Sequence, residues 1–118
     1  MKTLVLGASS NPNRYAYQAV GKLIQKGYEV IPLGVRDGEV HGQKIMTKPS
    51  QWEAIDTVSL YIAPNRQADY KDYLLRLSPR RVIFNPGTEN VELEQVLQAA
   101  GIQTEQACTL VLLSTNQY

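Results

Sequence analysis

A loop of small residues joins the first apolar run of this chain to an amphipathic segment, and this junction limits the possible folds more than any other feature. The run Leu4-Val5-Leu6 has the length and character of a buried strand, and residues 7–13 follow it directly. From residue 14 to 26, apolar side chains then recur on one helical face. A strand, a small-residue loop and a helix in this order are typical of α/β folds. Such a loop presents backbone N–H groups at the positive end of a helix dipole.

The rest of the chain continues this alternation of apolar strands and amphipathic helices. We expect strands at residues 3–7, 29–33, 57–62, 81–84 and 102–105. We expect helices at residues 14–26, 65–77 with Asn65 as its cap, 90–100, and two short ones at 52–55 and 108–113. A short edge strand fits within residues 40–46. The pattern predicts an α/β, Rossmann-like single domain over residues 1–118, with a mostly parallel sheet of about five strands and helices on both faces.

Composition excludes several classes of partner. The formal net charge is +1 and 19% of the residues are charged, so no overall charge draws the chain to nucleic acid or to a membrane surface. No apolar run approaches the roughly 18 residues that a membrane span needs. The single cysteine, Cys108, excludes an internal disulfide and fits a reducing compartment, so we expect a cytoplasmic protein.

Four loops are expected to meet at the carboxyl ends of the predicted strands, where α/β sheets bind ligands. They span residues 7–13, 34–37, 63–66 and 85–89. Arg14 indicates that this ligand is an anion. A cation in the first turn of a helix is unfavourable against the helix dipole unless an anion shares the site.

The loop after the first strand lacks the marks of a nicotinamide dinucleotide site. Of the G-x-G-x-x-G pattern only Gly7 is present, and the second predicted strand ends in Pro32-Leu33-Gly34 with no carboxylate for the ribose hydroxyls. Arg36 lies there instead, and a cation suits a phosphorylated ribose better than a free diol. The ligands of this kind are NADP and coenzyme A.

A succession of short motifs runs along nearly the whole chain: Gly7-Ala8-Ser9, Asn11-Pro12, Arg14-Tyr15, residues 27–32, Val40-His41-Gly42, Asp56-Thr57-Val58, Tyr61, Pro64, Asn85-Pro86-Gly87 and residues 101–108. In this order of motifs the chain resembles the small stand-alone CoA-binding domain proteins, which are related to the CoA-binding domain of the succinyl-CoA synthetase alpha subunit. The end of the second strand departs from the family, which often has a further proline or an Asn-Pro pair there.

The resemblance implies a Rossmann-like fold that binds coenzyme A or an acyl-CoA, with the diphosphate over the first loop. Ser9, Ser10 and Arg14 would hold phosphate, and Arg36 would approach the phosphorylated ribose. Pro64 and the pair Pro86-Gly87 would flank the nucleotide or the pantetheine arm. The cofactor site implied in this way comprises Gly7, Ala8, Ser9, Ser10, Asn11, Arg14, Tyr15, Arg36, Pro64, Pro86 and Gly87.

No catalytic or metal-binding set is expected elsewhere. His41 is the only histidine and has no second histidine or carboxylate cluster near it in sequence, so a structural role is expected. Cys108 lies in an apolar stretch, as core cysteines do. The carboxylates Glu89, Glu92 and Glu94 could suggest a catalytic cluster, but the dipole of the helix that begins beside them explains them.

Three hypotheses follow. The first is a CoA-binding module without catalysis of its own. The second is an NAD(P)-dependent oxidoreductase, against which the missing glycines and the missing acid count. The third is an interaction module with a vestigial nucleotide cleft. The apolar stretch 110–113 leaves the oligomeric state open, because it could cover either the core or a second copy in a homodimer.

Overall fold

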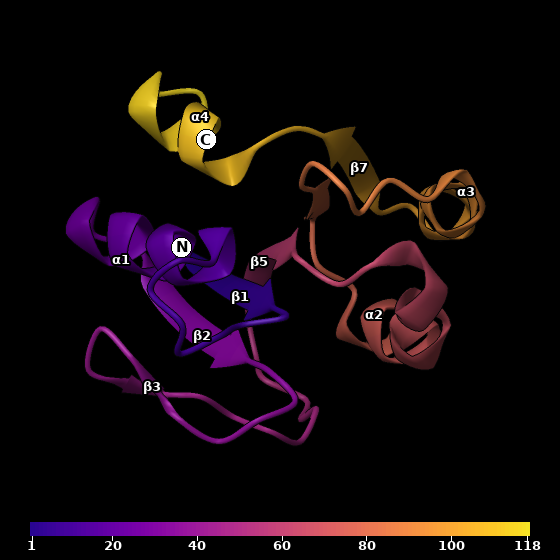
Figure 1. Ribbon diagram of the computed structural model, residues 1–118. Helices are drawn as coiled ribbons and strands as arrows, with labels where there is room; N and C mark the ends of the chain where they lie inside the picture. The colour runs from indigo at the N-terminus through magenta and orange to yellow at the C-terminus, as the bar shows by residue number, and fades with distance from the viewer.

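Five parallel strands form the central sheet of the computed structural model, which describes residues 1–118 (Figure 1). They are β1 (Lys2–Leu6), β2 (Glu29–Leu33), β5 (Ile55–Leu60), β6 (Arg81–Phe84) and β7 (Gln103–Gln106). Their spatial order is β2-β1-β5-β6-β7, and each neighbouring pair is parallel. The predicted fold class is confirmed. The chain turns from one half of the sheet to the other between β1 and β5, which is where such folds bind ligands.

Helices cover both faces of the sheet, because parallel strands point apolar side chains to either side. In Figure 1, α1 (Tyr15–Gln25) and α4 (Thr109–Ser114) lie on one face, and α2 (Lys71–Leu77) and α3 (Val91–Ala99) lie on the other. The first face buries Val5 against Val20 and Leu23 of α1 and Leu113 of α4. The second face packs Leu4, Val58 and Phe84 against Tyr73, Leu74, Leu93 and Leu97 of α2 and α3.

Helix α3 begins and ends where its sequence indicates. Asn90 is the N-cap, and its Oδ1 accepts a hydrogen bond of 3.2 Å from the Leu93 amide. Glu92 and Glu94 lie in the first turn, where the dipole favours negative charge. Gly101 follows the helix with φ of 84°, a left-handed conformation that glycine adopts without strain.

The predicted helix at 65–77 is wrong in its first half. Residues Pro64–Tyr70 form a 3₁₀ segment, η1, and only Lys71–Leu77 is α-helical. Asn65 is not the N-cap, because Ala63 occupies that position. No side chain caps the start of η1 with a hydrogen bond. The buried Gln67 side chain binds two carbonyl oxygens outside the segment, at Ile62 and Thr88. These bonds, with the proline at the start of η1, fix the segment against the loops after β5 and β6.

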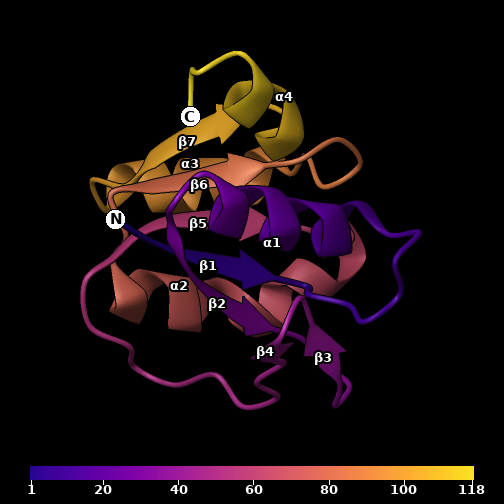
Figure 2. The same ribbon diagram turned by 90° about the vertical axis from the view of Figure 1, so that its left-hand side faces the viewer.

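Two short elements also differ from expectation. Residues 52–55 form no helix, since Ala54 has a left-handed φ of 60° and Ile55 already begins β5. Residues 40–46 contribute to a separate antiparallel hairpin of β3 (Glu39–Val40) and β4 (Gln43–Lys44) rather than to an edge of the main sheet. Figure 2 shows this hairpin beside the β2 edge, where Met46 makes one isolated bridge with Leu33.

The two chain ends lie on the same side of the molecule, at the amino ends of the strands and away from the loop after β1 (Figure 2). The Tyr118 hydroxyl lies 2.5 Å from Thr3 Oγ1, and the buried Arg81 guanidinium lies 4.7 Å from the Tyr118 ring centre. In α4, Leu112 and Leu113 are buried while Val111 is exposed, so this apolar stretch covers the core. No helix of the structure has both the length and the apolar character needed to cross a membrane.

Candidate functional site

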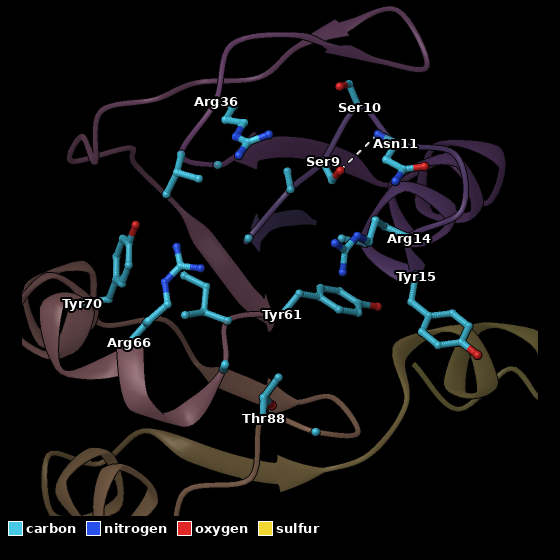
Figure 3. A pocket seen from close by; sticks show the side chains of 18 of the residues that line it. Ser9, Ser10, Asn11, Arg14, Tyr15, Arg36, Tyr61, Arg66, Tyr70 and Thr88 are labelled. Carbon is cyan, nitrogen blue, oxygen red and sulfur yellow. Dashed lines mark hydrogen bonds between the residues drawn. The ribbon is translucent and has the colours of Figure 1, made fainter.

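A cavity of about 660 Å³ opens at the carboxyl ends of β1, β2, β5 and β6 (Figure 3). Its walls are the loop after β1 with the start of α1, the loop after β2, the β5–η1 junction and the loop after β6. Its volume falls in the range of small-molecule and cofactor sites, roughly 300–1,000 Å³. The four loops expected to converge therefore do so, around one cavity.

Most of the residues singled out in the sequence line this cavity. Pro64 does not, although its neighbours Ala63 and Arg66 do. The others all contribute to the wall: Gly7, Ala8, Ser9, Ser10, Asn11, Arg14, Tyr15, Arg36, Pro86 and Gly87.

The loop after β1 has fewer open amides than its small residues suggest. The amides of Gly7 and Ala8 both donate to Leu33 O, at 2.8 and 3.0 Å, and so tie the loop to the end of β2. The amides of Ser9 and Ser10 make no hydrogen bond within the protein. The wall around Ser9 and Ser10 is thus the part of the loop with donors left for a ligand.

The N-terminus of α1 also faces the cavity without a partner of its own. Arg14 is the N-cap residue and makes no capping hydrogen bond, and the first turn contains no acidic residue. By contrast, α3 has an asparagine cap and two glutamates in its first turn. The first backbone N–H groups of an α-helix have no partner within the helix, so they can bind an outside acceptor. The helix dipole favours an anion at this end.

Three arginines line the cavity, and no aspartate or glutamate does. In Figure 3, the side chains of Arg14, Arg36 and Arg66 extend from three different walls toward the opening. None of the three takes part in an ion pair or a side-chain hydrogen bond within the protein. Unpaired cations gathered in one cavity repel each other, so this arrangement favours a ligand with several negative charges.

Arg66 lies in one of the loops that were expected to converge, but no role was predicted for it. The signal that could have found it is the one that applies to Arg14, a cation in the first turn of an expected helix. Thr88, Gly34, Val35 and Ala63 also line the cavity and lie in the loops that were expected to converge, without an assigned role. The lining residues outside those loops and the assigned site are Ala16, Tyr61, Ile62 and Tyr70.

A buried polar network lies behind the lining of the cavity, next to Tyr61 and Pro86 in sequence. Asn85 Nδ2 donates to Ser59 Oγ at 3.0 Å and to Leu60 O at 2.9 Å, and Asn85 Oδ1 accepts from the Thr109 amide at 2.8 Å. These bonds join β5, the end of β6 and the start of α4. Asn85 is fully buried in this role, so Pro86 and Gly87 after it are the part of the turn that reaches the cavity.

Tyr61 lines the cavity with a hydroxyl that is buried and makes no hydrogen bond. The nearby Ser59 and Thr109 hydroxyls are bonded to each other at 2.7 Å. Burial raises the pKa of Tyr61 to about 12. The side chain is therefore a neutral donor over the whole neutral range.

The other candidates of the sequence lie outside this cavity. His41 packs on α1, with its ring centre 4.4 Å from that of Tyr17. Cys108 is a half-buried free thiol just before α4. Glu89 accepts a hydrogen bond of 2.9 Å from the Gly87 amide and so holds the turn after β6. The structure groups no three His, Cys, Asp or Glu side chains that could hold a metal ion.

Comparison with known proteins agrees with this architecture and identifies the family of the chain. Residues 1–114 match the model of the family described as CoA binding domain. This chain belongs to that family. No curated protein matches the chain.

Solved structures share the fold over nearly the whole chain. An uncharacterized protein known from its crystal structure is 50% identical, with 99% of this chain and 97% of that chain covered and a TM-score of 0.98. A Thermus thermophilus protein is 26% identical over 99% of this chain and 90% of its own, with a TM-score of 0.87. A dinucleotide-forming acetyl-coenzyme A synthetase of Ca. Korarchaeum cryptofilum is 16% identical over 87% of this chain and 25% of its own, with a TM-score of 0.73, which shows the fold alone.

Proposed function

We propose that this protein binds coenzyme A, free or acylated, in the cavity at the carboxyl ends of the strands, and that it has no catalysis of its own. The observation that carries this proposal is a cofactor-sized cavity with three unpaired arginines and no carboxylate, beside an uncapped helix N-terminus. Coenzyme A carries a diphosphate and a separate phosphate monoester, so its charge suits this wall. Membership in the CoA binding domain family supports the same ligand.

The diphosphate fits best at the start of α1. The Ser9 and Ser10 amides are free there, and Arg14 and the helix dipole add positive charge. From this position the pantetheine arm can run past Gly87 and Thr88, where the wall has no charged side chain. The thiol or acyl end would then approach the loop after β6.

Thermal unfolding with coenzyme A, NADP, NAD and no ligand tests the proposal. A ligand at a hundred times its Kd stabilises the folded state by about 2.7 kcal/mol, which is readily measured as a rise in Tm. We expect this rise with coenzyme A and none with the nicotinamide nucleotides. A rise with NAD or NADP alone would favour the oxidoreductase, and no response to any of the three would favour an interaction module.

The variant Arg14→Ala tests the placement of the diphosphate. Loss of a charge-assisted phosphate contact should weaken coenzyme A binding by about 1.5–3 kcal/mol. Arg76→Ala is the matched control, because Arg76 is an exposed arginine on α2 that does not line the cavity. Equal affinity of the Arg14→Ala and control proteins would show that the diphosphate lies elsewhere.

A further inference from the structure

Gln67 lies behind the wall of the cavity and joins two of the segments that form it. The residue is 1% exposed and does not itself line the cavity. Its Nε2 donates to Ile62 O at 2.8 Å and to Thr88 O at 2.7 Å, and both of these residues do line the cavity. One side-chain amide therefore connects the β5–η1 junction with the loop after β6.

The side chain of Gln67 uses its full donor capacity in this position. A glutamine has two N–H donors on one nitrogen, and here each donor has a buried carbonyl oxygen as its acceptor. Its Oε1 accepts from Asn90 Nδ2 at 3.0 Å, and Asn90 Oδ1 in turn caps α3. A glutamate or a methionine of similar length offers at most one donor, so neither can hold both carbonyl oxygens.

The two segments that Gln67 joins form different sides of the cavity. Figure 3 shows Arg66 and Tyr70 of η1 on one side and Thr88 of the loop after β6 on the adjoining side. No backbone hydrogen bond joins residues 61–70 to residues 85–90. The hydrogen bonds between these two segments are those of the Gln67 side chain. The spacing of the two sides therefore depends on this one residue.

We propose that Gln67 is a positioning residue for coenzyme A, which fixes the spacing of the two sides of the cavity before the ligand binds. This inference rests on the proposed function, in which the pantetheine arm passes Thr88. Without the Gln67 amide the two segments lose their hydrogen bonds to each other, and the ligand must order both of them when it binds. That ordering costs free energy and weakens binding, although Gln67 acts only through the residues that it holds.

The test is the Kd of coenzyme A, measured by titration calorimetry at a temperature where circular dichroism shows each protein to be folded. Gln67→Met keeps the length of the side chain and removes both donors, so we expect its Kd to rise about tenfold. Thr57→Val is the matched control. Thr57 is also fully buried and hydrogen-bonded, but it lies at the amino end of β5, away from the cavity. Each substitution lowers the Tm by about 5–10 °C, but the control keeps its Kd within about twofold of the wild type.

Asn90→Ser tests the same inference with little change in stability, and it serves if Gln67→Met does not fold. Serine caps a helix as well as asparagine does, so α3 keeps its cap, while Gln67 Oε1 loses its partner. We expect a Tm close to that of the wild type and a Kd that is about threefold higher.

Gln67→Glu gives the same position a donor that depends on pH. At about pH 5.5 a buried carboxyl group keeps its proton and donates to one carbonyl oxygen, so the Kd lies below that of Gln67→Met. At about pH 8 the carboxylate has no donor and repels both oxygens, so the Kd lies above that of Gln67→Met. The charged neighbours Arg66, Asp69 and Glu89 are exposed and present in both variants, so their effects cancel.

The outcomes separate this inference from the function on which it rests. If the wild type binds coenzyme A and Gln67→Met and Asn90→Ser weaken binding no more than Thr57→Val does, the role of Gln67 is overturned and the proposed function stands. A Kd ratio of Gln67→Glu to Gln67→Met that does not change with pH leads to the same conclusion. Absence of coenzyme A binding by the wild type overturns the proposed function, and this inference with it.

Discussion

The imidazole of His41 packs so closely on Gly21 that a Cβ built on the glycine would lie 2.5 Å from His41 Nε2. This contact holds the β3–β4 hairpin against α1. Gly38, which directly precedes β3, packs against Ser10 of the loop after β1. The only histidine of the chain is thus a packing residue next to the site rather than a member of it.

We expect Gly21→Ala to stabilise the protein more when His41 is absent than in the wild type. Alanine in a helix is favoured over glycine by about 1 kcal/mol, but at position 21 its methyl group would push the imidazole off α1. In a His41→Gly background that gain should appear in the free energy of unfolding in urea. In the wild-type background it should be smaller by at least about 0.5 kcal/mol. An equal gain in both backgrounds would show that the histidine moves away freely.

We expect Gly34→Ala to disturb the loop after β1 and to weaken coenzyme A binding. A Cβ on Gly34 would lie 2.4 Å from the backbone oxygen of Ala8, so the loop that carries Ser9 and Ser10 must shift. Strain of this kind costs about 1–3 kcal/mol of stability. The free energy of unfolding and the rise of Tm with coenzyme A measure the two effects.

The control for this variant is Gly27→Ala. Gly27 has a φ of 88° and nothing within 4 Å of its built Cβ, and it follows α1 at the end away from the cavity. Its substitution should cost about 1 kcal/mol of stability through backbone strain and leave coenzyme A binding unchanged. If Gly34→Ala binds the cofactor as tightly as Gly27→Ala, the position of this loop does not control the site.

We expect stability to fall as the pH rises from about 10 to about 12. Burial raises the pKa of Tyr61 and of Tyr73 to about 12, above the ordinary value of 10.0. Between these values the unfolded chain loses protons that the folded protein retains, so alkali favours unfolding, by up to about 1.4 kcal/mol per pH unit for each group. The stabilising effect of their buried neutral form is complete below pH 10. Urea unfolding at pH 8, 10 and 11 measures this dependence.

Tyr73→Phe should flatten the pH dependence. The substitution also removes the 2.7 Å hydrogen bond from the Tyr73 hydroxyl to Ser50 O, so the variant should be less stable by about 1 kcal/mol at pH 8. Tyr15→Phe is the control, because Tyr15 is 70% exposed. A Tyr73→Phe protein that loses stability in alkali as steeply as the wild type would contradict a buried titrating group at this position.

Local sequence was sufficient for the order of the five strands of the main sheet and for helices α1, α3 and α4, because each of these elements carries its own periodicity or end signals. Asn90, the glutamates after it and Gly101 mark the two ends of α3 without help from the rest of the chain. The loops around the cavity were predictable for the same reason, since in a parallel sheet every strand ends at the same edge.

Tertiary contacts decided the remainder. Residues 64–70 wind as a 3₁₀ segment, which helical periodicity did not predict, and Gln67 within it bonds two carbonyl oxygens outside the segment, at Ile62 and Thr88. Whether the Gly7 and Ala8 amides are free depends on Leu33 O, on another strand. The sequence by itself determined the five strands of the parallel sheet, most of the helices that cover it and the loop with Arg14. Only the folded chain brought Arg36 and Arg66 to opposite walls of one cavity, because long-range hydrogen bonds set the final positions of loops that local propensity leaves open.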